Sequence, residues 1–346
     1  MLLNPGQNPT ESEHLAAARQ GDRQHFSEMT EPFRRELQVH CYRILGSLHE
    51  AEDMVQETML RAWTRLETYQ GRAPFRAWLY KIATNACLDL LDRRRSRRLL
   101  PPQAAAASDP GDQIAPPSAE VLWLEPLPDE WLEDSSAANP EARYSESESI
   151  SLAFLTALQK LSPRQRAVLI LRDVLDFSAI ETADVLDLTV SAVNSALHRA
   201  RGSLSQEYQK QEVQPYDERT QSLLDLFLKA WESADVAGLV ALLKEDATLA
   251  MPPSPSWYIG REAIRTFVAM TVFADEGMFG GEAAGRWKLM GTRANGSPAF
   301  AIYQRTGTNE YQPFGIHVLR FEEKQLSGLI SFIDPTLPGY FASPQT

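Results

Sequence analysis

Cysteine is scarce in this chain of 346 residues, and long apolar runs are missing. Only Cys41 and Cys87 are present, which excludes a disulfide framework and a cysteine-rich zinc site. No apolar run approaches the roughly 18–20 residues of a membrane span, and residues 1–19 lack the basic start and apolar block of a secretory signal. We therefore expect a cytoplasmic protein without membrane contact, whose two thiols are reduced and buried.

Basic side chains are outnumbered, with 34 against 46 acidic ones, and they are unevenly placed. Residues 99–150 carry one basic and 11 acidic side chains, whereas residues 1–98 and 151–210 have net charges of +2 and +1. The acidic stretch is also rich in proline and alanine, a composition that disfavours a packed core. The sequence therefore predicts an acidic linker between two folded parts.

Part of this linker carries large apolar side chains that a solvated segment does not need. They include Trp123, Leu124, Pro126 and Trp131. We interpret them as a contact that docks the linker on a folded domain. A few exposed apolar groups in a solvated linker are the alternative.

Both flanking parts read as helical. Apolar residues at three- and four-residue steps predict about four helices before the linker, with breaks near residues 21–22, 46–47 and 69–71. Residues 151–209 are again helical, and Ser162 and Thr189 stand at predicted helix starts.

The pattern changes after residue 217. Two short helices, at about 220–234 and 236–243, precede stretches rich in β-forming residues. The stretches are 247–251, 286–292, 299–305, 314–322 and 326–334. They predict an α+β domain with a curved antiparallel sheet.

The helix that follows Pro74 combines aromatic and basic groups. At about 100° per residue its core stripe contains Phe75 and Ile82, while Trp78, Lys81 and Asn85 lie on a flank. Five arginines follow between residues 93 and 98. Stacking surfaces beside phosphate-binding charge suit unpaired nucleic acid. The alternative is a structural helix with a half-buried tryptophan and a lysine that reaches solvent.

The preceding helix carries an acidic stripe that cannot serve DNA phosphates. The stripe includes Asp53, Gln56 and Glu57, and Leu60 is expected to face away from it. We interpret the stripe as a docking surface for a protein partner. An ordinary solvated face is the alternative.

Residues 177–202 have the form of a helix-turn-helix. Ile180, Ala183, Val185 and Leu186 supply the predicted apolar stripe of the first helix. The second helix exposes side chains suited to base edges, and Arg201 can reach phosphate. The exposed side chains are Ser191, Asn194, Ser195, His198 and Arg199. The alternative is a generic amphipathic helix pair.

No catalytic constellation, metal-ligand spacing or phosphate loop is evident, and we expect no cofactor. His317 and Asp334 fall in predicted strands of the last domain, where such residues are more often structural than catalytic. Trp257 and Tyr258 are candidate walls of a cavity in that domain.

Two segments resemble an extracytoplasmic-function (ECF) sigma factor of bacterial RNA polymerase. Residues 52–63 and 75–85 resemble its region 2, and residues 161–166 and 197–201 resemble its region 4. The resemblance covers about residues 10–98 and 151–208, in the order of the family.

The resemblance implies two partners, core RNA polymerase (through its clamp and flap) and promoter DNA. Asp53, Gln56 and Glu57 match the helix that docks on the clamp. The exposed side chains of the second helix-turn-helix helix, together with Arg201, match the reader of the duplex −35 element. The residues that match the capture of the melted −10 strand are Arg76, Trp78, Tyr80, Lys81 and Asn85.

Residues 217–341 are similar to the SnoaL-like cone-shaped α+β fold, through residues 258–264 and 332–335. Residues 123–126 also resemble a linker motif of sigma factors with this extension. The resemblance implies a regulatory domain whose cavity could take a small ligand.

The sequence thus predicts a multidomain protein with two all-α sigma domains, at 10–98 and 151–208. The acidic linker at 99–150 joins them, and the SnoaL-like α+β domain at 217–341 follows. Our hypothesis is a sigma factor without catalytic activity, modulated by its own C-terminal domain. Two alternatives are a bifunctional protein whose last domain is a sensor or a cyclase- or isomerase-like enzyme, and an ordinary helix-turn-helix repressor.

Overall fold

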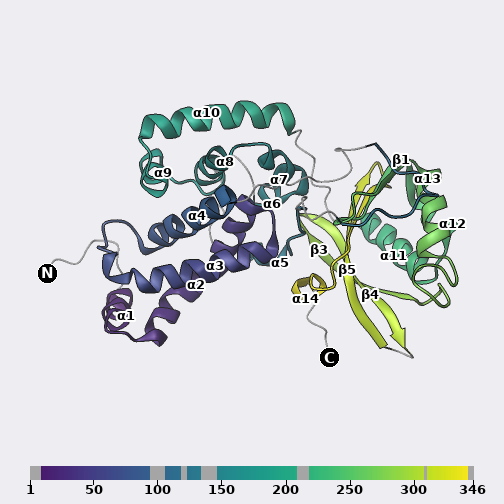
Figure 1. Cartoon of the computed structure of the whole chain (residues 1–346), viewed down its shortest axis with the longest axis horizontal. Helices are drawn as coiled ribbons and strands as arrows, with labels where there is room; N and C mark the ends of the chain where they lie inside the picture. Colours follow the sequence, from purple (N-terminus) through teal and green to yellow (C-terminus); the bar gives the residue numbers. More distant parts are fainter. Residues whose placement is uncertain are drawn as a thin grey trace. The chain divides into compact units, whose positions relative to one another are not determined.

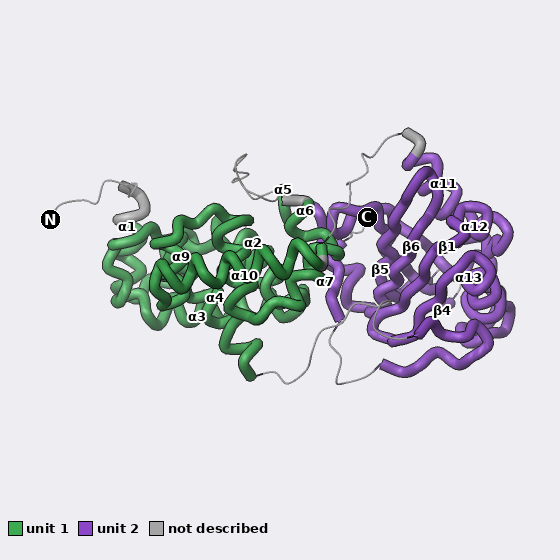
Figure 2. The backbone as a smooth tube through the Cα atoms, turned by 90° about the horizontal axis from the view of Figure 1, so that it is seen from above, with its two compact units in different colours: residues 1–95, 130–210 green, residues 96–129, 211–346 purple. Residues whose placement is uncertain are grey.

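The computed structural model describes residues 9–93, 106–117, 123–133, 146–208, 218–307 and 310–341 (Figure 1). The chain divides into two compact units, each with its own elements (Figure 2). The helical unit comprises residues 1–95 and 130–210, and the C-terminal unit comprises residues 96–129 and 211–346. The predicted linker is therefore shared between them. Of the five arginines at 93–98, Arg93 is described and the other four lie outside the described residues.

The helical unit begins with the expected set of four helices. They are α1 (Pro9–Arg19), α2 (Arg23–Leu45), α3 (Leu48–Thr64) and α4 (Phe75–Arg93), with a 3-10 turn η1 (Leu66–Thr68) before the last. The predicted breaks are confirmed, and each has a local cause. Asp22 accepts hydrogen bonds from the first backbone N–H groups of α2, and Ser47 does the same for α3. Gly46 ends α2 in the left-handed conformation, at φ 71°.

The second part of the helical unit contains the predicted helix-turn-helix. Its elements are α5 (Glu130–Glu133), α6 (Glu146–Ile150), α7 (Leu152–Gln159), α8 (Pro163–Leu169), the π-helical turn η2 (Ile170–Val174), α9 (Ala179–Leu186) and α10 (Val190–Glu207). Ser162 and Ser178 form capping boxes with Gln165 and Glu181. The prediction that Ile180 belongs to the apolar stripe that packs in the core is wrong, because its side chain is 67% exposed.

Buried arginines join the two parts of the helical unit. Arg166 of α8 donates to the Ile44 carbonyl of α2 at 2.5 Å and to the Leu158 carbonyl at 2.9 Å. Arg43 of α2 donates to the Ser149 hydroxyl at 2.8 Å. Because these groups are buried, each contact satisfies polar atoms that would otherwise lack water. These contacts join residues 9–93 to residues 146–208 within one compact unit.

The C-terminal unit is a sheet covered by helices. Its strands are β1 (Leu243–Ala250), β2 (Trp257–Ile259), β3 (Trp287–Ala294), β4 (Ser297–Gly307), β5 (Glu310–Glu322) and β6 (Gln325–Phe332). Its helices are α11 (Glu218–Glu232), α12 (Val236–Leu242), α13 (Arg261–Phe267) with the π-helical turn η3 (Val268–Val272), and α14 (Pro338–Phe341). Phe227 of α11, Leu239 of α12 and Phe267 of α13 join the core formed with the sheet.

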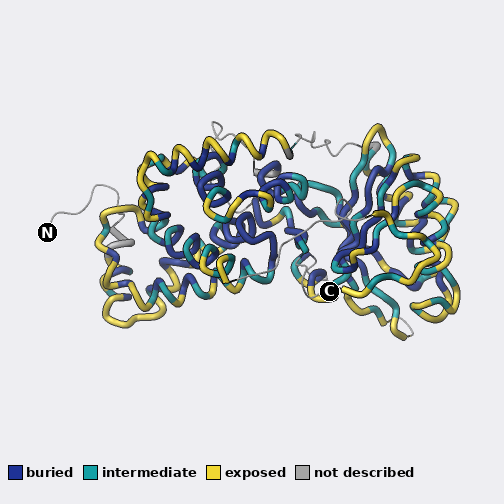
Figure 3. The backbone as a smooth tube through the Cα atoms, turned by 45° about the horizontal axis from the view of Figure 1, so that its top comes forward, coloured by how far each residue is buried: buried dark blue, intermediate teal, exposed yellow. Residues whose placement is uncertain are grey.

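The sheet corrects one prediction. Its order is β2-β1-β6-β5-β4-β3, and β1 pairs with β6 in parallel, so the sheet is mixed and not antiparallel throughout. Residue alternation marks a strand but carries no information on its direction. The central strands do not alternate strictly between buried and exposed residues, since β5 is buried without interruption from Gly315 to Leu319; Figure 3 shows the buried parts of the chain in dark blue.

None of the described helices has the length and apolar character needed to span a bilayer.

Candidate nucleic-acid interface

An aromatic cluster forms where the 69–74 loop meets α4. The Trp78 ring centroid lies 5.2 Å from that of Tyr69 and 5.6 Å from that of Phe75. Tyr69 and Phe75 are buried, whereas Trp78 is half-buried. The Tyr69 hydroxyl donates to the Ala73 carbonyl at 2.9 Å. The cluster therefore fixes the loop and leaves part of the indole at the surface.

Two polar side chains of α4 contact the end of α9, and we call this the α4–α9 contact. Lys81 Nζ donates to the Asp184 carbonyl and pairs with the Asp187 carboxylate, both at 2.6 Å. Asn85 Nδ2 donates to the Val185 carbonyl at 3.3 Å. Carbonyl groups in the last turn of a helix lack intrahelical partners and attract cations. The flank of α4 that the sequence assigns to DNA is occupied by α9 in this structure.

Arg76 and Tyr80 are drawn into the same packed region. Tyr80 is 1% exposed, and its ring lies 4.8 Å from His40 and 5.4 Å from Phe177. Burial raises the pKa of the Tyr80 phenol, which is therefore neutral. Arg76 pairs with Glu36 at 3.0 Å, with its guanidinium 4.7 Å from the Tyr80 ring centroid. A nucleic-acid base cannot reach Tyr80 in this arrangement.

The helix-turn-helix presents one polar face of α10. Thr189 accepts from the Ala192 N–H at 3.2 Å and begins the helix, while Val193, Leu197 and Ala200 are buried. The predicted reader side chains all lie exposed around one shallow depression. They are Ser191, Asn194, Ser195, His198 and Arg199. The arrangement is a helix surface of the kind that enters the major groove.

Arg201 differs from the other predicted reader residues. Its guanidinium forms two hydrogen bonds with Asp173, at 2.5 and 2.9 Å, and the Asp173 side chain is 2% exposed. A buried carboxylate requires such a partner. The pair joins α10 to η2.

On α3 the acidic stripe is at the surface. Asp53 and Gln56 are exposed, and Glu57 accepts a hydrogen bond from Arg61 at 2.6 Å. Leu60, which the sequence predicts to face away from the stripe, is 57% exposed. An exposed leucine beside acidic and amide groups suits contact with another protein more than contact with DNA.

The linker residues predicted to dock are divided between the units. In the C-terminal unit, Leu124 is buried, and Leu127 exchanges backbone and side-chain hydrogen bonds with Asn295, at 2.9 and 3.0 Å. Asp129 accepts from Arg293 and from the Gly296 N–H. Pro126 is buried and Trp123 is half-buried in the same segment.

In the helical unit, Trp131 of α5 lies on α2. Its side chain is buried, and the Arg35 guanidinium lies 4.1 Å from the ring centroid. The apolar segment that the sequence shows as one stretch is thus attached in two places, by residues 123–129 to the C-terminal unit and by Trp131 to the helical unit.

The C-terminal unit encloses a largely apolar cavity of about 420 Å³. His317 lines it, whereas Trp257 and Tyr258 do not, so the sequence-based choice of those two walls is wrong. Burial lowers the pKa of His317 to about 3, and its Nδ1 lies 2.8 Å from Ser331 Oγ. Asp334 instead accepts from Thr336 outside the cavity lining.

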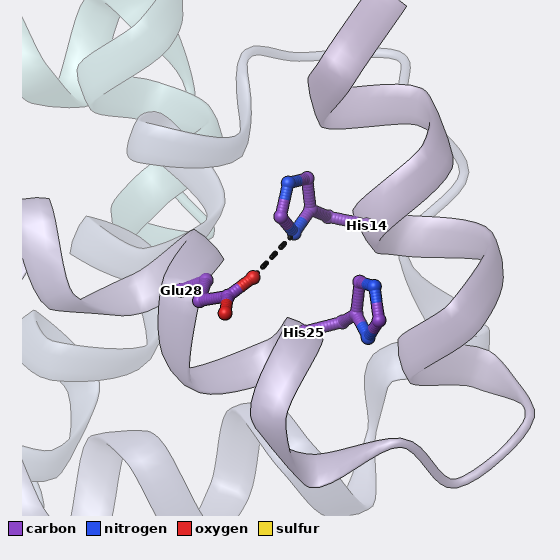
Figure 4. A group of neighbouring side chains, drawn as sticks. All are labelled: His14, His25 and Glu28. Atoms are coloured by element: carbon purple, nitrogen blue, oxygen red, sulfur yellow. Dashed lines mark ion pairs between the residues drawn. The ribbon is translucent and has the colours of Figure 1, made fainter.

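One cluster was missed in the sequence. Among the described residues, His14, His25 and Glu28 form a group whose ligand atoms lie within 4.8 Å of one another (Figure 4). His14 pairs with Glu28 at 3.2 Å, and His25 faces the Asp22 carboxylate at 2.8 Å. Each imidazole already faces a carboxylate, so the group can hold α1 on the start of α2 without an ion. The sequence does not reveal this cluster, because His14 lies on α1 whereas His25 and Glu28 lie on α2.

Comparisons with known proteins agree with the two helical segments. The family model "Sigma-70 region 2" matches residues 29–97, and "Sigma-70, region 4" matches residues 151–204. The ECF RNA polymerase sigma factor SigG of Mycobacterium tuberculosis is 41% identical, over 99% of this chain and 88% of that protein. SigW of Bacillus subtilis is 25% identical, over 55% of this chain and 92% of that protein.

The fold also matches a solved structure. The crystal structure of the M. tuberculosis extracytoplasmic-function sigma factor SigJ has a TM-score of 0.54 and 21% identity. The match covers 92% of this chain and 99% of that one.

Proposed function

The chain belongs to the ECF family of RNA polymerase sigma factors, with a SnoaL-like C-terminal domain, and from this premise we propose how its parts divide the work. As a sigma factor it binds core RNA polymerase and promoter DNA, and sigma factors are not enzymes. In our proposal residues 10–98 and 151–208 carry these contacts in the cytoplasm. The linker at 99–150 and the domain at 217–341 modulate them.

We assign the contacts by exposure and chemistry. The exposed face of α3, with Asp53, Gln56 and Glu57, binds the polymerase. The exposed face of α10 reads the −35 duplex through Asn194, Arg199 and their neighbours. We assign Arg201, which the buried Asp173 holds, to fixing the position of α10.

The main support for our proposal comes from the residues of α4 that we assign to the −10 strand, because the α4–α9 contact covers them. Lys81 and Asn85 hydrogen-bond to α9, and Tyr80 packs on Phe177 just before α9. A melted strand needs unstacked aromatic and basic groups at the surface. We propose that this structure is a closed state, and that α9 must leave α4 before Arg76, Trp78, Tyr80, Lys81 and Asn85 can meet the −10 strand.

The C-terminal domain acts on this closed state through the linker. Residues 123–129 are held by Asn295, Arg293 and Gly296 of the C-terminal unit, and Trp131 is held by Arg35 of the helical unit. Only one peptide bond separates Asp129 from α5. In our proposal, release of the linker on the C-terminal side leaves α5 attached to the helical unit alone, through Trp131.

We propose no catalytic role for the C-terminal domain. The sequence offers no evident acid–base pair in this domain, and the hydrogen-bond partners of His317 and Asp334 are Ser331 and Thr336 respectively. A general acid or base must lie within hydrogen-bond reach of the proton that it transfers, and Asp334 does not line the cavity.

In vitro transcription with core RNA polymerase tests the modulation, on a promoter whose start site is first mapped with the full chain. Asp129→Ala removes the contacts with Arg293 and Gly296, and we expect promoter-specific transcript to rise roughly two- to fivefold, the scale of one partly exposed ion pair. Asp112→Ala is the matched control, since it removes the same charge from an exposed part of the linker. Unchanged output and promoter occupancy for Asp129→Ala, and for a chain ending at residue 210, would contradict the proposal.

A further inference from the structure

The cavity of the C-terminal unit has the size and surface of a small-molecule site. Its volume of about 420 Å³ lies within the range of ligand pockets, roughly 300–1,000 Å³. Aromatic rings from several elements form much of its wall, and among the described residues no side chain with a formal charge lines it. These rings belong to Trp231, Phe267, Phe279, Trp287 and Phe314. A charged ligand would lose its hydration there without gaining a counter-charge.

Two buried polar atoms of the wall have no hydrogen-bond partner among the described residues. They are His317 Nε2 and Trp231 Nε1. His317 is 2% and Trp231 is 4% exposed, and the two rings meet edge to face with centroids 4.3 Å apart. Unpaired buried polar groups are unfavourable, and an indole N–H can only donate. The missing partner of Trp231 is therefore an acceptor, and an oxygen atom of a ligand supplies one; His317 Nε2 donates or accepts according to its tautomer.

Linker residues close part of the same cavity. Ile114, Ala115, Pro116 and Pro117 belong to its wall. The Ala115 N–H donates to Ser256 Oγ at 2.9 Å, and Ser254 Oγ donates to the Ala115 carbonyl at 2.8 Å. Further back, the Ser108 N–H donates to the Trp257 carbonyl at 2.8 Å. A molecule in the cavity would touch the linker directly.

We infer that the cavity binds a neutral, largely apolar small molecule with an oxygen acceptor, and that binding is linked to the attachment of linker residues 106–117. Any ligand that contacts the attached linker must change the equilibrium between its attached and detached forms. The inference of a binding site depends only on the cavity. The inference that binding regulates the protein rests on the proposed role of the linker and the C-terminal domain.

Nile red, a neutral dye with a carbonyl oxygen, is a suitable probe for the full-length chain. We expect saturable binding to one site, seen as a rise in dye fluorescence. Val272→Trp places an indole at a partly buried wall position and should weaken binding at least tenfold. Val240→Trp is the matched control, because Val240 is also partly buried in this unit but does not line the cavity.

His317→Phe keeps a ring in place and removes both ring nitrogens, Nε2 and the Nδ1 that contacts Ser331, so it should weaken binding severalfold even if Val272→Trp fails to fold. Hydrogen exchange of the peptide covering residues 106–117 measures the linkage, and saturation with dye should change its rate at least threefold. Absence of saturable binding, or equal binding by all variants, would overturn the site. Binding without a change in exchange would overturn the linkage. An unaltered transcription output in the linker variants would instead count against the proposed function and leave the site standing.

Discussion

His40 of α2 is a fully buried histidine whose behaviour depends on its neighbours. Its Nε2 lies 2.8 Å from Thr84 Oγ1, and the Tyr80 ring packs on its imidazole. Burial, with the charges of Arg43 and Arg76, lowers the pKa of His40 to about 3. The side chain is consequently neutral in the folded protein near neutral pH.

This predicts a specific acid sensitivity. In the unfolded chain the histidine pKa is about 6.5, so below that pH the unfolded state takes up a proton that the folded state refuses. Stability is fully present above pH 6.5 and is lost as the pH falls toward 3. At pH 5, protonation of His40 in the unfolded chain lowers the unfolding free energy by about 2 kcal/mol relative to its value above pH 6.5.

Urea unfolding at pH 7 and pH 5 measures this effect. We expect His40→Asn to lose less stability between the two pH values than the unmodified chain, by about 2 kcal/mol. His198→Asn, at an exposed position on α10, is the control and should leave the pH dependence unchanged. Identical pH dependence in His40→Asn and the unmodified chain would show that His40 is not buried as described.

At the scale of one element, α10 separates a reading face from a supporting one. Arg199 is exposed on the polar face, while Arg201 is bound to the buried carboxylate of Asp173. The two arginines are only two residues apart, yet their surroundings give them different roles. Spacing along the helix cannot make this distinction, because Asp173 comes from η2.

Alanine substitutions of these two arginines should therefore have different effects. Arg199→Ala is expected to weaken binding of polymerase holoenzyme to a mapped promoter by about 1–3 kcal/mol, without loss of stability. Arg201→Ala leaves Asp173 without its partner and should lower the unfolding free energy by at least about 1 kcal/mol. Promoter binding and urea unfolding of both variants provide the measurements. Reversed effects would place Arg201, and not Arg199, on the DNA.

At the scale of the whole molecule, contacts distant in sequence decide which surfaces are available. In the helical unit, α9 covers the flank of α4 that would meet a melted strand. The principal ion pair, between Lys81 and Asp187, is partly exposed, with side chains 38% and 74% accessible. Such a pair contributes little free energy, so the closed state can be opened by a modest change.

Asp187→Asn tests this directly, because asparagine also accepts the left-handed backbone of residue 187, at φ 52°. Loss of the charge should raise promoter-specific transcription about two- to fivefold, in line with about 0.5–1 kcal/mol. Asp184→Asn is the matched control, since that exposed side chain lies on the same helix and only its backbone carbonyl contacts Lys81. Equal output from both variants would argue that the α4–α9 contact does not limit activity.

Much of the architecture was predictable from local sequence. Asp22, Ser47, Ser162 and Thr189 cap helices where their side chains stand just before an apolar repeat. Buried Cys41 and Cys87 also agree with expectation. By contrast, Ile180 was misassigned, because an apolar position on a helix does not reveal whether another element covers it.

The sequence by itself determined most helices, most strands, the acidic composition of the linker and the motifs of a sigma factor, since these depend on near neighbours along the chain. Only the tertiary structure decided that α9 occupies the flank of α4, that β1 runs parallel to β6 and that the apolar linker segment has two attachments. The cavity that Ile114 and His317 line is likewise formed only by the tertiary structure. Its walls come from residues as far apart as 114 and 333, and packing between such distant positions leaves no periodic trace in a sequence.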